Sequence, residues 1–281
     1  MAKLKHTFKT DILFKQLFRK YPHLLKSLVA QLLRIPLESI VHFEIKNPEM
    51  PPDSLGKKFC RLDILMKVDG EQVNLEVQVE NEGDYPERIL FQWARIYSNA
   101  LPVGDKYNEL PRTIIISILD FTLFSDCTEF HSEFQALEVT RSNLLTDKMV
   151  LHFFELPKLP DRIDKKEDLL LLWLALFKAN TEENLKRIEE LGVNELSEAV
   201  TAYNNITASS EFLEMERLRI KASHDEAQAL YNAEQRGAKS ERKKWQGVVA
   251  EKDTALADKD AEIEKLRKQL AENKAEVGDG V

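Results

Sequence analysis

The chain has 281 residues, of which 43% are apolar and 31% are charged, enough for one large domain or a domain with an extension. Its formal net charge of −8 excludes a uniformly basic surface. The two cysteines, Cys60 and Cys127, give no pattern for a disulfide framework or a zinc site.

The N-terminal region is predicted to be helical and basic. Apolar residues recur at helical spacing from Lys9 to Leu33, and Pro22 either starts a second helix or kinks a single one. Residues 1–34 hold eight Lys and Arg side chains and one acid, so this segment carries +7 and the rest of the chain −15. We expect the cluster to bind a polyanion rather than a membrane, because the helix also supplies large apolar residues to a core.

Nothing in the sequence predicts a membrane protein. The N-terminus lacks the apolar run and the small-residue cleavage site of a signal peptide. The most apolar stretch, residues 169–177, has nine residues, whereas a span needs about 20. We therefore expect a buried helix there and a cytoplasmic protein.

Three strands are predicted before residue 81. Residues 40–46 form the first, and a proline-rich loop separates it from 59–68 and 72–80. The last two are joined by Asp69-Gly70, a strong hairpin signal. In the third strand, apolar residues alternate with a polar set on the opposite face: Asn74, Glu76, Gln78 and Glu80.

The hairpin brings two carboxylates together. Reflection about the turn places Asp63 opposite about residue 76, within a residue or two of register. Glu76 and Gln78 project from one face of their strand, so two carboxylates and an amide converge. Mg²⁺ takes one or two carboxylates with waters and substrate phosphate, which suits phosphodiester hydrolysis. Spacing alone favours the plainer alternative, a strand whose polar face meets solvent.

The remaining elements follow in order. A helix is predicted over 86–101, a central buried strand over 112–121, further strands around 133–140 and over 149–156, and only helix from about 164. In the tail, one heptad position is apolar, but the second position of the expected seam is mostly polar. This pattern is compatible with a dimerising coiled coil and with a single solvated helix. The first position holds Val249, Leu256, Ile263, Leu270 and Val277, and the second holds Lys252, Lys259, Leu266 and Asn273. We expect the final residues, 276–281, to be disordered.

The segment RLDILMKVDGEQVNLEVQVE resembles the core of the PD-(D/E)XK nuclease superfamily. It resembles most closely the recombination-promoting nuclease and transposase branch, in which Glu-x-Gln replaces Glu-x-Lys. Further segments match the family in order over about residues 7–160: TDILFKQLF, ERILFQWARIYSNAL, YNELPRTIIISILDF and LHFFELPKL.

The resemblance implies a fold and an activity. The fold is α/β, a mixed central sheet flanked by helices (a restriction-endonuclease-like core) over residues 1–160, with an all-helical extension formed by a segment over 161–208 and a long helix over 209–281. The activity is Mg²⁺-dependent DNA cleavage linked to recombination or transposition, with Mn²⁺ as a substitute ion. Asp63 and Glu76 would bind the metal, and Gln78 would replace the lysine, with the loss of a charge that aids catalysis.

Other interpretations stay open. The alternative function is a non-catalytic DNA-binding or assembly protein that keeps the nuclease fold and forms a homo-oligomer through its C-terminal helix. Asp11 is an auxiliary acid or, as we favour, a helix N-cap. Four further charged residues near the core either support the site or are solvated or paired elsewhere: Lys15 and Arg61 as phosphate contacts, Glu80 as an extension of the acidic patch, and Arg88 as a support. No glycine-rich phosphate loop is present, so no nucleotide cofactor is implied.

Overall fold

A computed structural model describes the chain except residues 1, 47–48, 51–59, 103, 161–167 and 279–281, and the side chains of 49–50, 60–61 and 270–278. Two compact units are present, residues 1–216 and 217–281. Within the described ranges, no helix combines the length and apolar character needed to cross a bilayer.

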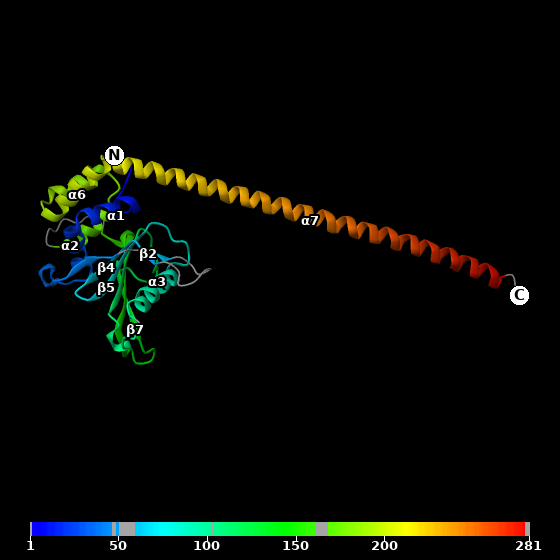
Figure 1. Cartoon of the computed structure of the whole chain (residues 1–281), viewed down its shortest axis with the longest axis horizontal. Coiled ribbons are helices and arrows are strands. Elements are labelled where there is room, and N and C mark those ends of the chain that lie inside the picture. Colours follow the sequence, from blue (N-terminus) through cyan, green and yellow to red (C-terminus); the bar gives the residue numbers. More distant parts are fainter. Residues whose placement is uncertain (1, 47–48, 51–59, 103, 161–167, 279–281) are drawn as a thin grey trace. The chain divides into compact units, whose positions relative to one another are not determined.

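The first unit is built on a mixed sheet. Six strands of the described chain lie in the order β1-β4-β5-β6-β8-β7, with antiparallel pairs at both edges and parallel pairs between β5, β6 and β8 (Figure 1). Their bounds are Phe43–Ile45 for β1, Ile64–Val68 for β4, Glu71–Gln78 for β5, Thr113–Leu119 for β6, His131–Leu137 for β7 and Leu144–Glu155 for β8. A second, two-stranded sheet pairs β2 (Glu49–Met50) with β3 (Cys60–Arg61).

The hairpin between β4 and β5 turns at Asp69-Gly70 as predicted. Both residues have positive φ, 47° and 94°, the backbone that a tight two-residue hairpin turn requires and that glycine adopts without strain. The Asp69 carboxylate accepts hydrogen bonds from the amides of Val41 and His42. The turn is therefore tied to the segment that leads into β1.

Helices cover both faces of the sheet. On one face lie α1 (Asp11–Lys20), α2 (Pro22–Leu32), α4 (Leu169–Lys178), α5 (Glu182–Glu190) and α6 (Asn194–Thr207), packed in one large apolar core. The other face carries α3 (Tyr85–Asn99) and a smaller apolar cluster. Single 3₁₀ turns lie at Leu37–Ser39, Tyr107–Glu109 and Leu156–Lys158. The predicted α/β class is confirmed.

Local features explain these helices. Pro22 starts α2 rather than kinking one long helix, and the missing amide hydrogen is tolerated at a first helical position. The apolar stretch over 169–177 is the buried helix α4, in which Trp173 is fully enclosed. All of β6 is buried, as its β-branched run predicts for a strand covered on both faces.

One predicted strand is interrupted. Residues 59–68 were expected to run continuously, but the chain bends at Leu62 and Asp63, between β3 and β4. Leu62 is fully buried in the apolar cluster beside α3. Burial of this side chain takes the chain out of the strand ladder, and the bend falls at a candidate site residue.

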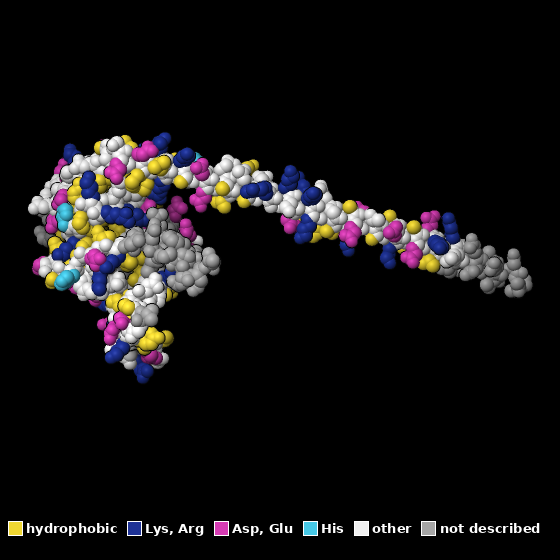
Figure 2. Space-filling model, viewed as in Figure 1, with side chains coloured by type: hydrophobic (Ala, Val, Ile, Leu, Met, Phe, Trp, Pro, Cys, Tyr) yellow, Lys and Arg dark blue, Asp and Glu magenta, His cyan; other side chains and the backbone are white. Residues whose placement is uncertain are grey.

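The tail is a single long helix, α7 (Ser210–Gly278), and its described side chains from Arg217 onward are exposed. Phe212, in its first turn, is fully buried in the core of the first unit. Farther along, hydrophobic side chains alternate with charges of both signs (Figure 2). The described part of this helix therefore presents exposed apolar residues.

Candidate active site

Two backbone hydrogen bonds across the β4–β5 hairpin hold the carboxylates of Asp63 and Glu76. Ile64↔Leu75 is the β4–β5 pair farthest from the turn. The same register, continued by one residue on each strand, places Asp63 opposite Glu76. The amide of Asp63 donates to Glu76 Oε1 at 3.0 Å, and the amide of Val77 donates to Asp63 Oδ2 at 3.0 Å. Both carboxylates therefore bind backbone amides at the same end of the hairpin.

The middle of the polar face of β5 is buried, so the solvent-facing interpretation does not hold for Asn74 and Glu76. Asn74 is completely buried and Glu76 is only 9% exposed. Helix α3 turns Tyr85 and Gln92 toward this face of the sheet, where both are buried. Ser117 of β6 pairs with Glu76 in the parallel ladder and is also buried. A polar layer therefore lies under a helix, where each charge without a partner lowers the stability of the fold.

Burial destabilises the charged form of the Glu76 carboxylate. Burial first, and then the charge of Asp63, raises its pKa from 4.5 to about 7. Hydrogen bonds from Asn74 Nδ2 at 2.8 Å, from the Asp63 amide and from the Gln92 side chain oppose this rise but do not cancel it. Such a group is stabilised by a nearby cation.

Helix α1 contributes two more charges. Lys15 Nζ lies 3.0 Å from Asp63 Oδ1 and 2.5 Å from Asp11 Oδ1, and its side chain is only 14% exposed. Burial lowers the pKa of Lys15, but Asp63 and Asp11 outweigh that effect and raise it. Lys15 is therefore not a solvated charge.

The N-cap role favoured for Asp11 is wrong. The N-cap position belongs to Thr10, and Asp11 is the first residue of the helix. The Thr10 hydroxyl accepts from the amide of Thr7 instead of capping the helix. Asp11 still suits the first turn, where the helix dipole favours a negative charge, and its carboxylate holds Lys15.

The other candidate residues are less central. Gln78 is half-buried, and its Nε2 donates to the backbone oxygen of Glu80 at 2.9 Å. The Glu80 side chain is exposed and faces water. Arg88 pairs with Glu82 at 3.2 Å and lies 4.9 Å from the centre of the Tyr85 ring. The side chain of Arg61 is outside the described residues.

Sequence reasoning missed the residues that surround Glu76. Asn74 was visible in the alternation of β5 but carried no chemical signal. Tyr85 and Gln92 come from α3, and the helical period of that segment predicted a buried face without showing that polar groups lie on it. Burial, and then Glu76, raises the pKa of Tyr85, which keeps its hydroxyl protonated beside the carboxylate.

The basic N-terminal cluster is partly neutralised within the chain. Lys5 pairs with Glu216 at 3.0 Å, Lys9 pairs with Asp120 at 2.6 Å, and Lys15 is held by the two acids described above. The Asp120 amide donates to the Gln78 backbone oxygen, so the Lys9 pair sits near the end of β5. The segment therefore offers a nucleic acid less free charge than its +7 suggests.

The donor set fits a magnesium ion bound with few protein ligands. In the part of the chain that the structure describes, no group of three or more His, Cys, Asp or Glu side chains could hold a metal. Mg²⁺ usually keeps several waters and takes one or two carboxylates together with substrate phosphate. Asp63 and Glu76 would supply such carboxylates, and a cation beside Glu76 would favour its charged form, which burial disfavours.

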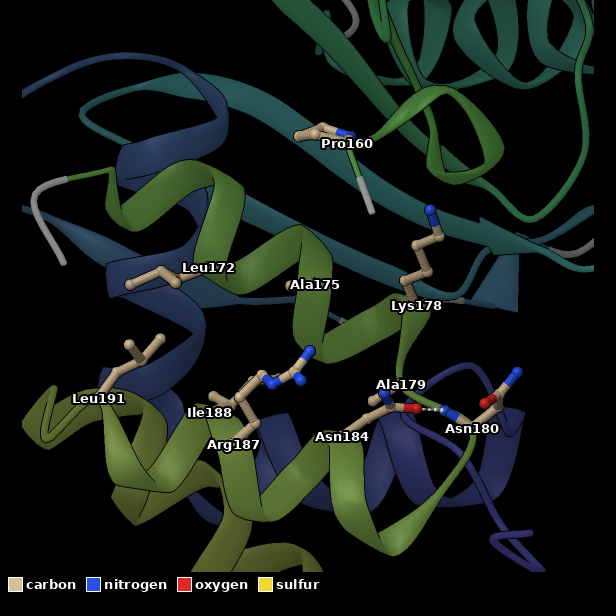
Figure 3. Close-up of a pocket in the computed structure, with 10 residues that line it drawn as sticks. All are labelled: Pro160, Leu172, Ala175, Lys178, Ala179, Asn180, Asn184, Arg187, Ile188 and Leu191. Atoms are coloured by element: carbon tan, nitrogen blue, oxygen red, sulfur yellow. Dashed lines mark hydrogen bonds between the residues drawn. The ribbon is translucent and has the colours of Figure 1, made fainter. Parts of the chain in front are cut away.

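A separate cavity of about 240 Å³ lies between α4 and α5 (Figure 3). Its floor is apolar, and its rim carries Lys178 and Arg187 beside two asparagines. Lys178 Nζ donates to the backbone oxygen of Leu159. Its described lining includes none of the clustered carboxylates, so it is not part of this site.

Comparison with known proteins identified one family. A family model described as PD-(D/E)XK nuclease family transposase matches residues 8–233, which includes all strands of the main sheet and the start of α7. No curated protein and no solved structure gave a significant match.

Proposed function

The chain belongs to the PD-(D/E)XK nuclease family transposases, and from this premise we propose that it is a metal-dependent DNA endonuclease. The observation that carries the proposal is the pair of backbone hydrogen bonds, from the Asp63 amide to Glu76 and from the Val77 amide to Asp63, that holds the two carboxylates at the same end of the hairpin. The proposed reaction is hydrolysis of phosphodiester bonds in DNA, and its proposed role is in recombination or transposition.

The proposed roles follow from the donor set. Asp63 and Glu76 would hold Mg²⁺, or Mn²⁺ in its place. When bound, the ion supplies a Lewis acid for the phosphoryl oxygen and lowers the pKa of a water. Gln78 has its amide nitrogen on the Glu80 backbone, and its Oε1 is an acceptor that would orient the attacking water.

Purified protein with supercoiled plasmid and Mg²⁺ is expected to produce nicked or linear DNA, and EDTA to stop the reaction. Asp63→Ala and Glu76→Ala should abolish cleavage, because each removes one metal-binding carboxylate. Glu44→Ala is the matched control, since its carboxylate lies on β1 of the same sheet and is exposed. Undiminished cleavage in both site variants would overturn the assignment.

Calorimetry separates this function from a non-catalytic DNA-binding protein with the same fold. The nuclease should bind Mg²⁺ with a heat signal that the Asp63→Ala/Glu76→Ala double variant lacks. Absence of metal binding in the wild type, with DNA affinity unchanged in the double variant, would favour the non-catalytic protein.

We infer that a second copy of this chain covers the apolar residues of α7. Val249, Leu256 and Ile263 are about half exposed and fall seven apart. Continuing the heptad toward the N-terminus places Trp245, Ala238 and Tyr231 at the complementary position. The apolar residues therefore occupy one heptad position from Tyr231 to Trp245 and the other from Val249 to Ile263, and together they form one longer seam. Lys252 and Lys259 weaken this seam.

Removal of residues 246–281 is expected to lower the mass measured by light scattering from a dimer to a monomer. Leu256→Lys and Ile263→Lys should do the same by placing charge in the seam. Ala261→Lys is the control, because that position lies on the opposite side of the helix. A monomeric wild-type protein would refute the inference.

A further inference from the structure

Helix α1 brings the charged side chain of Lys15 against one of the two proposed metal ligands. Lys15 lies one helical turn after the start of α1, and its ammonium contacts the Asp63 carboxylate at 3.0 Å. Asp11, on the preceding turn, holds the same Nζ atom at 2.5 Å. The Lys15 ammonium is therefore held against Asp63, one of the two proposed metal ligands, and the Lys15 side chain is mostly buried.

Gln78 does not provide that cation. Its side chain is neutral, and its amide donors are directed in part to the Glu80 backbone oxygen. Phosphodiester hydrolysis builds negative charge on the phosphate oxygens, and a preorganised cation in a site of low polarity stabilises that charge strongly. An amide is a much weaker substitute for an ammonium group.

We propose that Lys15 is a catalytic residue that supplies from helix α1 the positive charge that Gln78 lacks. This proposal rests on the proposed nuclease function. The water oxygen forms a bond to phosphorus as the bond to the leaving deoxyribose oxygen breaks. The water proton passes to solvent, and the leaving oxygen takes a proton from solvent. Lys15 stays protonated and stabilises the phosphate charge, while Asp11 is the positioning residue that holds its ammonium.

A competing role for Lys15 is purely structural. Its ammonium would then neutralise Asp63 in the absence of metal and be displaced when Mg²⁺ binds. The two roles predict different effects when the charge is lost. A structural lysine competes with the metal, so its removal would tighten Mg²⁺ binding without slowing cleavage. A catalytic lysine, once removed, slows cleavage whatever happens to the metal affinity.

The test measures single-turnover cleavage, Mg²⁺ affinity by calorimetry and melting temperature for Lys15→Gln, for Lys15→Gln/Gln78→Lys and for Lys20→Gln. Lys20 is an exposed lysine on the same helix and serves as the control. Lys15→Gln is expected to cleave at least about 100-fold more slowly, with Mg²⁺ bound as tightly as in the wild type or more tightly. The double variant Lys15→Gln/Gln78→Lys should cleave at least about 10-fold faster than Lys15→Gln, because the lysine at position 78 supplies the positive charge from β5.

Asp11→Asn gives an independent line of evidence if Lys15→Gln does not fold. It leaves Lys15 charged but loosens its hold, so cleavage should fall about 10-fold with Mg²⁺ affinity retained. Wild-type rates in Lys15→Gln, or in Asp11→Asn if only that variant folds, would overturn the role of Lys15. If Asp63→Ala is inactive in the same experiment, the nuclease assignment survives that failure. If the wild type does not cleave, or if Asp63→Ala cleaves normally, the nuclease function itself fails and the role of Lys15 with it.

Discussion

Glu76→Gln is expected to abolish DNA cleavage and, at the same time, to make the metal-free protein more stable at pH 8. The variant removes a metal-binding carboxylate, so catalysis is lost. It also removes a buried negative charge that lies beside Asp63. A glutamine keeps an oxygen to accept from the Asp63 amide and from Asn74. The site therefore trades stability for function.

The pH dependence has a definite sign. The pKa of Glu76 is about 7 in the folded protein and 4.5 when unperturbed. Between these values the folded chain binds a proton that the unfolded chain has released. The free energy of unfolding of the wild type therefore falls as pH rises through this window. The full effect corresponds to about 3 kcal/mol.

Denaturant unfolding of both proteins in EDTA, from pH 4.5 to 8, measures this effect. The free energies of unfolding of the wild type and Glu76→Gln should be similar at pH 4.5. The stability advantage of the variant should then grow as the pH rises to about 7. Added Mg²⁺ should then stabilise the wild type and not the variant, because only the wild type binds it. A stability difference that does not change with pH would contradict the burial of an ionisable Glu76.

Lys158→Met is expected to destabilise the fold by about 3–5 kcal/mol. Its ammonium lies 2.6 Å from the carboxylate of Glu155, which is completely buried at the end of β8. The same carboxylate accepts from the amides of Leu123 and Phe124, which follow β6. Removing the lysine leaves a buried charge without its counter-ion.

Denaturant unfolding at pH 7 checks the effect of Lys158→Met. Arg141→Met is the matched control, because Arg141 forms the same three-residue-spaced pair with Glu138 but at the surface, and its loss should change stability much less. The double variant Lys158→Met/Glu155→Gln should recover much of the loss, since a glutamine removes the buried charge and keeps an oxygen for the amides of Leu123 and Phe124. Equal effects of the two single variants would show that burial does not set the strength of the pair.

Local sequence patterns predicted the hairpin that carries the site. The alternation of β5 and the Asp69-Gly70 turn depend on backbone periodicity and on turn chemistry, both of which act between near neighbours. Together they set the register that places Asp63 opposite Glu76. The helical period of residues 9–33 predicted α1 for the same reason, and Pro22 marked the start of α2.

The same patterns could not show which groups surround the carboxylates. Periodicity identifies a polar face but not whether a helix covers it, so the buried environment of Glu76 under α3 was missed. The contact of Lys15 with Asp63 joins α1 to a bend before β4, and no local rule relates two positions so far apart in the chain. The N-cap of α1 was also misassigned, by one residue, because Thr10 and Asp11 carry similar start signals.

Sequence patterns predicted the candidate ligands and the pairing of two of them, because those features depend on neighbouring residues along one hairpin. The charge environment of these residues came from the tertiary fold. Burial under α3 raises the pKa of Glu76, and the approach of α1 brings an ammonium group to Asp63. Both effects depend on packing between distant segments, which fixes how much solvent and which charges each carboxylate meets.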